Sequence, residues 1–254
     1  MNRIDEAGEV RRAEGAKPTS GKRPYRFILF DADDTLLDFR RCEREALGGA
    51  LLDGGYELKL DDCLSRYSLI NKELWLEFER GQVTQRELRG ERFRRLFAEF
   101  GVEGDAEAFG AAYLNRFGRG SFLTPDALAV CDALKPHYDL SILTNGVSDV
   151  QFSRISGSEL KDHFDHIIVS DDAGFQKPSA GIFDYAFRRI GCTDKSQALI
   201  VGDSLSSDIR GGYDYGIHTC WFNPEKLPNE SGIAPTYEIG GLTELLPLLL
   251  DERK

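Results

Sequence analysis

The sequence predicts an α/β fold in which a doubly wound parallel sheet, a Rossmann-like core, carries an inserted helical cap. From residue 124 onward, short apolar runs alternate with segments of helical periodicity, which is the pattern of consecutive βαβ units. Residues 38–121 show helical periodicity alone. They follow one further apolar run at residues 25–30. The chain is therefore expected to begin a sheet, leave it for a helical bundle and then return to it.

The first expected strand, residues 25–30, ends in an acidic cluster. Asp31, Asp33 and Asp34 lie within four residues. Neighbouring carboxylates repel one another unless protons or a cation offset their charge. Open α/β sheets bind their ligands at the carboxyl ends of the strands, where this cluster falls. It therefore predicts a site for a hard, oxygen-liganded cation such as Mg²⁺.

Residues 38–121 are expected to form the cap, a small bundle of helices. Thr84 and Glu87 are a capping-box pair ahead of the third helix, Gly101 ends that helix, and a fourth follows at about residues 105–117. Aromatic side chains recur at helical spacing and are assigned to the bundle core rather than to a base-stacking surface. They are Phe39, Tyr67, Trp75, Phe78 and Tyr113.

The catalytic core is predicted from residues 25–37 and 122–254. Its later strands are expected at residues 140–143, 166–169, 198–201 and 219–222, with helices near 149–163, 179–190 and 206–215. Thr124-Pro125 predicts a helix with proline at its first position. The apolar residues 245–250 indicate the end of a docked terminal helix. Strands and helices that alternate in this order predict parallel βαβ units in a doubly wound sheet.

Composition limits the partners of the protein. Lys and Arg number 32 against 43 Asp and Glu, and the net charge of −11 disfavours a nucleic-acid polymer or an anionic membrane. The five cysteines stand far apart without a C-x-x-C pair, as expected of free thiols in a reducing cytoplasm. No apolar run approaches the length that spans a bilayer. Residues 1–24 are expected to form a disordered tail, and monomer and homodimer are both open.

Polar residues follow four of the predicted strands. Asp31 and Asp33 follow the first, Thr144 and Asn145 the second, Lys177 lies beyond the third and Asp203 follows the fourth. The carboxyl ends of parallel strands open on one edge of a sheet. Residues far apart in the sequence are therefore expected to meet in a single site.

The order of these motifs resembles the haloacid dehalogenase-like phosphohydrolase superfamily. The matching stretches are Asp-x-Asp-x-Thr at residues 31–35, an apolar run ending in Thr144, Lys177-Pro178, and Gly202-Asp203 with Asp208. Insertion of the helices after the first motif is similar to the C1 type of cap in that superfamily. The resemblance implies an Mg²⁺-dependent phosphomonoester hydrolase. It also implies that Asp31, Asp203 and the backbone carbonyl of Asp33 hold the metal.

The main site residues each have a chemical role in such a reaction. Asp31 is expected to attack phosphorus and form an aspartyl-phosphate. Asp33 is expected to protonate the leaving oxygen and then to activate water. Thr144, Asn145 and nearby backbone N–H groups are expected to bind phosphate oxygens, to which Lys177 adds a fixed positive charge.

Two further acids are placed less directly. Asp208, on the helix after Asp203, is expected to orient Lys177 or a metal-bound water. Asp34 stands where many members of the superfamily carry glycine. It is either a turn former or a group that supports the metal ligands from behind.

Several alternatives share parts of this pattern. A haloacid dehalogenase needs no metal and typically lacks the second aspartate of the first motif, so Asp33 disfavours it. A phosphomutase uses the same aspartate pair but excludes water from the site. A receiver-type phospho-accepting domain is about half as long as this chain and carries no large helical insert. A non-catalytic binding protein on the same fold is a further alternative.

Within the superfamily the chain is most similar to pyrimidine nucleoside monophosphate 5'-nucleotidases. The similarity includes Asp34 in place of glycine, residues 143–146, residues 151–165, residues 219–223 and residues 232–236. It implies hydrolysis of dUMP, dTMP and UMP-like monophosphates in preference to purine nucleotides and sugar phosphates. A phosphatase for a small sugar phosphate stays open, because the motifs touch only the phosphate.

Overall fold

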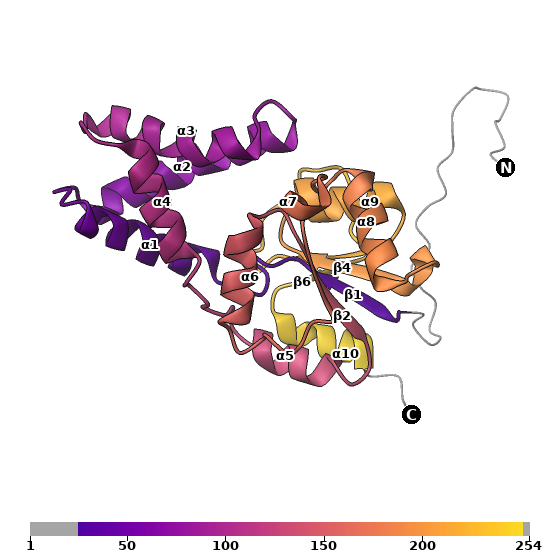
Figure 1. The fold of residues 1–254 in the computed structure, drawn as a ribbon. Helices are drawn as coiled ribbons and strands as arrows, with labels where there is room; N and C mark the ends of the chain where they lie inside the picture. Colours follow the sequence, from indigo (N-terminus) through magenta and orange to yellow (C-terminus); the bar gives the residue numbers. More distant parts are fainter. Residues whose placement is uncertain (1–24, 251–254) are drawn as a thin grey trace, which may run out of the picture.

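The computed structural model describes residues 25–250, and the predicted tail at residues 1–24 lies outside them. Six parallel strands form one sheet in the order β3-β2-β1-β4-β5-β6 (Figure 1). They are β1 Phe27–Phe30, β2 Asp139–Thr144, β3 His166–Val169, β4 Ala198–Gly202, β5 His218–Phe222 and β6 Tyr237–Ile239. The chain builds β1 to β3 toward one edge and then returns beside β1 to build β4 to β6 toward the other. The predicted doubly wound α/β fold is confirmed.

Helices cover both faces of the sheet (Figure 1). Those of the core are α5 Ala127–Leu134, α6 Ser148–Ser156, α7 Ser170–Ala173, α8 Ala180–Ile190, α9 Arg210–Tyr215 and α10 Leu245–Leu250. Short turns of 3₁₀-helix lie at Lys195–Gln197 and Leu242–Glu244, and a π-helical turn at Leu205–Ile209 precedes α9.

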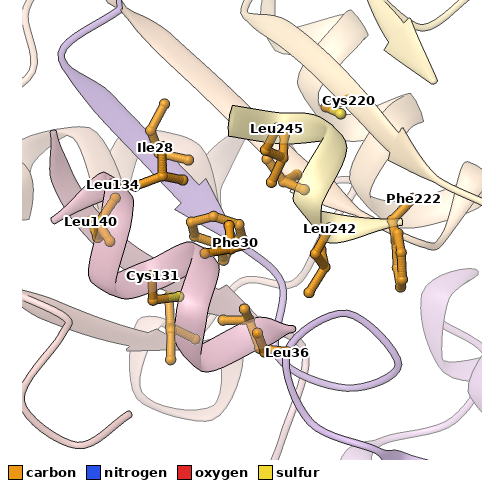
Figure 2. Close-up of a cluster of buried hydrophobic side chains, with 14 of the residues drawn as sticks. Ile28, Phe30, Leu36, Cys131, Leu134, Leu140, Cys220, Phe222, Leu242 and Leu245 are labelled. Atoms are coloured by element: carbon orange, nitrogen blue, oxygen red, sulfur yellow. The ribbon is translucent and has the colours of Figure 1, made fainter. Parts of the chain in front are cut away.

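The central strand β1 shows why the sheet is buried on both faces. Ile28 and Phe30 point into a cluster with α5 and α10 (Figure 2), whereas Phe27 and Leu29 pack in another cluster with α8. Successive side chains of a strand point to opposite faces, so a strand covered on both sides reads as a continuous apolar run. Each end of such a strand is held rigidly, which fixes the residues that follow it.

Four helices stand to one side of the sheet and form an insert between β1 and β2 (Figure 1). They are α1 Phe39–Asp53, α2 Leu60–Glu79, α3 Gln85–Phe100 and α4 Ala106–Phe117, and are called the four-helix insert below. The predicted capping box of Thr84 and Glu87 is present, and Gly101 ends α3 in the left-handed conformation at φ 62°. Tyr67, Phe93 and Tyr113 contact one another in a core whose buried residues all come from the insert, with Val150 of α6 packed against it.

Two short segments connect the insert to the sheet and pair with each other. The Asp38 N–H donates to the Phe122 carbonyl at 2.9 Å, and the Thr124 N–H donates to the Leu36 carbonyl at 2.9 Å. The outgoing and returning chains are therefore tied together beside the acidic cluster. The domain boundaries at residues 37–38 and 121–122 remain predictions.

Several predicted elements differ from those observed. Helix α5 begins at Ala127 rather than at Thr124-Pro125, because Pro125 lies in a turn and Asp126 takes a left-handed conformation at φ 65°. Helix α6 ends at Ser156, not near 163. Strand β6 was not predicted, since its three residues include only one that is buried.

The five cysteines are free and buried, as predicted. No helix within residues 25–250 is long and apolar enough to cross a membrane.

Candidate active site

The predicted site residues meet at the carboxyl ends of β1, β2 and β4. Asp31 follows β1 directly, and its N–H donates to the Val201 carbonyl of β4 at 2.8 Å. The Lys177 ammonium lies between two carboxylates, 2.6 Å from Asp31 Oδ1 and 2.6 Å from Asp208 Oδ1. It also donates to the Leu143 carbonyl of β2 at 2.7 Å. All three hydrogen bonds of the ammonium are thus used to fix it in one position.

Asp208 reaches Lys177 because Gly202 has no side chain. A Cβ at Gly202 would overlap the Asp208 carboxyl group. The second oxygen of that carboxyl accepts the Ser204 N–H at 3.1 Å, so both of its oxygens are bonded. The Gly202-Asp203 motif therefore combines an acid at the strand end with the space that the Asp208 carboxyl needs.

Charge in this cluster is unbalanced among the described residues. Asp31, Asp203 and Asp208 surround one ammonium, that of Lys177. Burial raises the pKa of Asp31 to about 7, against the opposing attraction of Lys177. Burial, reinforced by the charge of Asp31, also holds the pKa of Asp203 well above its usual value. Burial acts to lower the pKa of Lys177, but Asp208 and Asp31 outweigh it and raise that pKa above its usual value. A cation beside Asp31 and Asp203 would offset the excess negative charge.

The donor atoms fit a hard divalent cation. One carboxylate oxygen from each of Asp31, Asp203 and Asp208 lies within 4.8 Å of the others. Because both Asp208 oxygens are engaged by Lys177 and Ser204, the carboxylates of Asp31 and Asp203 are the ones left for a metal. Carboxylate oxygens are the ligands that Mg²⁺ prefers. The metal role predicted for the Asp33 carbonyl stays a prediction.

Asn145 holds the loop that carries Lys177. Its Nδ2 donates to the Lys177 carbonyl at 2.8 Å, and its Oδ1 accepts the Lys177 N–H at 2.8 Å. Both polar ends of the side chain are therefore bonded to backbone. The predicted contact between Asn145 and phosphate stays a prediction.

Thr144 is held by Gln151 of α6. Gln151 Nε2 donates to Thr144 Oγ1 at 3.0 Å and to Asp33 Oδ2 at 2.8 Å. A hydroxyl that accepts one hydrogen bond keeps its own hydrogen for another acceptor, such as a phosphate oxygen. Gly146 is required here, because a Cβ on it would lie 2.5 Å from Gln151 Cγ.

Arg154, one turn after Gln151 on α6, binds the other oxygen of Asp33. Its side chain is fully buried, and the ion pair with Asp33 Oδ1 is accompanied by bonds to Gln151 Oε1 and to the Gly120 carbonyl, each at 3.0 Å. Gly120 lies on the chain returning from the insert. Arg154 therefore connects the predicted acid/base residue with the insert's attachment. The sequence alone predicts no role for Gln151 or Arg154, although residues 151–165 contribute to the family resemblance.

Asp34 is a turn former. It has a left-handed backbone conformation, with φ 57°, which explains why glycine suits this position. Burial raises the pKa of its carboxyl group to about 6, and the neighbouring charge of Asp33 adds to the effect.

A cavity of about 450 Å³ joins the sheet edge to the insert. It is lined on one side by Asp31, Asp33, Thr144, Asn145, Lys177 and Asp203 and on the other by Phe39, Glu43, Ser68, Asn71, Lys72 and Trp75. Tyr67, Phe78 and Tyr113 are buried in the bundle core as predicted. Phe39 and Trp75 pack against the edge of that core, where their rings contact Phe117 and Phe78. Both are half-buried and also line this cavity, which the sequence did not predict.

A second cavity, of about 500 Å³, adjoins the first on the side of β5. It shares Asp34, Arg40 and Asp203 with the first cavity. Arg40 at the start of α1 pairs with Glu225 beyond β5, Nη1 to Oε1 at 2.6 Å. This pair joins the insert to the core at a second place beside the site.

Comparison with known proteins matches this arrangement to one family. The sequence model of haloacid dehalogenase-like hydrolases matches residues 25–216. The HAD-hydrolase YfnB of Bacillus subtilis is 42% identical over 89% of this chain and 95% of its own length. Its crystal structure, described as bound to magnesium, superimposes with a TM-score of 0.84 over 89% of this chain and 99% of that one.

Two further relatives are named for an activity. The pyrimidine 5'-nucleotidase YjjG of Escherichia coli is 34% identical over 88% of this chain and 97% of its own length. The pyrimidine 5'-nucleotidase PynA of Streptococcus pneumoniae is 35% identical over 89% of this chain and 95% of its own length. The likeness therefore extends through the four-helix insert as well as the sheet.

Proposed function

Because the chain belongs to the haloacid dehalogenase-like hydrolase family, we propose that it is an Mg²⁺-dependent phosphomonoester hydrolase, specifically a 5'-nucleotidase for pyrimidine nucleoside monophosphates. The observation that carries the phosphatase proposal is Lys177 fixed 2.6 Å from Asp31, with Asp203 beside them. This places a nucleophile and a fixed positive charge at one strand edge. The two named pyrimidine nucleotidases support the choice of substrate.

Asp31 begins the reaction by attacking phosphorus. A bond forms between its free carboxylate oxygen and phosphorus, and the bond between phosphorus and the ester oxygen breaks. Lys177 holds the other oxygen of Asp31 and so orients the carboxylate. The Thr144 hydroxyl hydrogen, left free by the bond from Gln151, is available to a phosphate oxygen. Asp33 supplies a proton to the departing oxygen, which leaves as the nucleoside hydroxyl.

The second step returns the enzyme to its starting state. Asp33, now ionised, accepts a proton from water, whose oxygen attacks phosphorus and releases inorganic phosphate from Asp31. Gln151 and Arg154 hold the two oxygens of the Asp33 carboxyl in the unliganded arrangement. They keep that group in place between turnovers.

Asp31 and Asp203 would hold Mg²⁺ through their carboxylates, Asp31 with the oxygen that does not attack phosphorus. The ion supplies charge stabilisation to the phosphoryl group as the reaction proceeds. Three carboxylates, two of them buried, lie together here with a single ammonium, so a cation would offset their excess charge.

The test is phosphate release from a panel of phosphomonoesters with and without Mg²⁺. We expect Mg²⁺-dependent turnover with the highest kcat/KM for UMP, dUMP and dTMP, and lower values for purine nucleotides. A panel led by a hexose or triose phosphate would reject the nucleotidase but keep the phosphatase. Isomerised sugar phosphate without free phosphate would instead identify a phosphomutase, and full activity in chelator without retained metal would reject the Mg²⁺ mechanism.

A further inference from the structure

The insert contributes a buried carboxyl group, Glu43 of α1, to the wall of the active-site cavity. Glu43 is 4% exposed. Its Oε2 accepts a hydrogen bond from the Ser68 hydroxyl of α2 at 2.7 Å. Its Oε1 is also buried but has no hydrogen-bond partner in the described part of the chain. A buried acceptor without a donor is unfavourable, so this oxygen lacks a group that a ligand could supply.

Asn71 places an amide one turn along α2 from Ser68, in the wall of the same cavity. It is 5% exposed, and its Oδ1 accepts a hydrogen bond from Arg92 Nη1 of α3 at 3.4 Å. With the oxygen used in this way, the hydrogen-bond network assigns the Nδ2 group as the donor left for another partner. The insert therefore brings an acceptor on Glu43 and a donor on Asn71 to one cavity.

Two aromatic rings line the cavity with this pair. Phe39 lies one turn before Glu43 on α1, and Trp75 lies one turn after Asn71 on α2. Both are half-buried, so part of each side chain is accessible. Flat apolar surfaces beside a donor and an acceptor suit a planar ring with a polar edge.

We propose that Glu43 and Asn71 bind the polar edge of the pyrimidine base. Glu43 Oε1 accepts the N3–H of uracil or thymine, Asn71 Nδ2 donates to the adjacent carbonyl oxygen, and the ring packs against Phe39 or Trp75. The assignment rests on the proposed function, because a phosphate attacked by Asp31 and held at Thr144 puts the base toward the insert side of the cavity. Cytosine presents the same order of groups through its exocyclic amine and N3.

The charge around Glu43 agrees with this role. Burial raises the pKa of Glu43 to about 7, Asp34 adds to the rise, and the Ser68 hydroxyl with Arg92 and Arg40 opposes it. An N–H donor from the base would stabilise the ionised carboxylate and so replace the hydration that burial removes. A sugar phosphate without a base carries no such N–H donor.

The experiment compares three substrates that share the phosphate but differ at the base. They are UMP, N3-methyl-UMP, which lacks the N3–H donor, and ribose 5-phosphate, which lacks the base. For the wild-type enzyme we expect kcat/KM to fall about 10- to 100-fold from UMP to N3-methyl-UMP, the range for a hydrogen bond to a charged group. This comparison needs no variant and so does not depend on whether a substitution folds.

Glu43→Gln then identifies the protein partner. Glutamine keeps the size and can keep the Ser68 bond through its carbonyl, which turns an amide N–H₂ toward the place of Oε1. We expect kcat/KM for UMP to drop to the level of N3-methyl-UMP, while ribose 5-phosphate changes less than about 2-fold. Glu45→Gln, an exposed position on the same helix, is the matched control and should change none of the three.

Two results would overturn the assignment while leaving the phosphatase intact. One is equal kcat/KM for UMP and N3-methyl-UMP in the wild-type enzyme. The other is a parallel loss on UMP and ribose 5-phosphate in Glu43→Gln, which would show that Glu43 only supports the insert. Failure to hydrolyse any phosphomonoester would instead reject the proposed function itself.

Discussion

The sheet edge and the four-helix insert face the same cavity, but they differ in whether their buried charged groups already have hydrogen-bond partners. At the sheet edge Lys177 has three acceptors within 2.7 Å, and both oxygens of Asp208 are bonded. In the insert, Glu43 has one bonded oxygen and one without a partner among the described residues. Groups that are already bonded are preorganised for a reaction, whereas unpaired groups await a ligand. The contrast separates the chemistry of the site from its selectivity.

Asp31→Asn should cause the largest loss of activity, and it changes only the sheet edge. The amide keeps the shape of the side chain but removes the nucleophile, so we expect kcat to fall by about 10⁴-fold or more for every substrate. Steady-state phosphate release measures the loss, and circular dichroism checks the fold. Because the insert is untouched, the ranking of substrates in binding should persist. A variant that keeps a tenth of wild-type kcat would contradict the aspartyl-phosphate route.

Removal of the metal should have the next largest effect, again on the sheet edge. Asp31 is buried and Asp203 half-buried beside it, and the pKa of each is raised, so a cation would offset their excess charge. We expect chelation to lower kcat/KM by about 10³-fold or more for all substrates, and added Mg²⁺ to restore it. Elemental analysis must show that the chelated protein is free of metal. Unequal losses across the substrate panel would mean that the ion also contributes to base selection.

Gln151→Met should impair one step of the reaction at the sheet edge, the protonation of the leaving oxygen. Methionine fills the space but cannot donate to Asp33 or Thr144, so protonation of the leaving oxygen should be impaired. We expect kcat/KM for UMP, whose alkoxide leaves poorly, to drop about 30-fold. For p-nitrophenyl phosphate, whose phenolate leaves readily, we expect a drop of less than about 3-fold.

The ratio kcat/KM reports only the steps up to release of the leaving group. Gln197→Met is the matched control, because Gln197 directly precedes β4, at the end of that strand away from the site. Arg154→Lys tests the other oxygen of Asp33, and partial activity with the same dependence on the leaving group would support a positioning role. Equal losses on both substrates would show that α6 only supports the fold at this point.

The two regions also differ in how far the sequence predicts them. Asp31, Lys177 and Asp203 were placed together because buried strands end in recognisable positions and parallel strands end on one edge. The helices of the insert were also predicted, down to the capping box at Thr84. Helix caps and buried strands both depend on residues close together in the chain, so their positions can be recognised in the sequence alone.

What the sequence did not predict depends on contacts between elements. Phe39 and Trp75 have the spacing of core residues, but spacing identifies one face of a helix and not whether protein or a cavity covers it. Gln151 and Arg154 resemble polar positions of an ordinary amphipathic helix. Their role follows only from the approach of α6 to Asp33, for which the small residue Gly146 leaves room.

A last and smaller effect concerns the pH dependence of stability in the insert. Burial raises the pKa of Glu43 to about 7 from its ordinary 4.5. Between these values the folded state holds a proton that the unfolded state releases. The stability this gives is therefore complete below about pH 4.5 and is lost as the pH rises through 7. Glu43→Gln removes this dependence.

We expect the free energy of unfolding of the wild-type protein to fall by about 2 kcal/mol more than that of Glu43→Gln between pH 5 and pH 8. Denaturant titrations in saturating Mg²⁺ measure the difference, because bound cation keeps Asp31 and Asp203 ionised in both proteins. A pyrimidine nucleoside, which has no phosphate to hydrolyse but can donate to Glu43, should reduce this difference, since the ionised carboxylate then has a partner. Parallel pH profiles for the two proteins would mean that Glu43 is not buried as described, and the contrast between the two walls of the cavity would fail there.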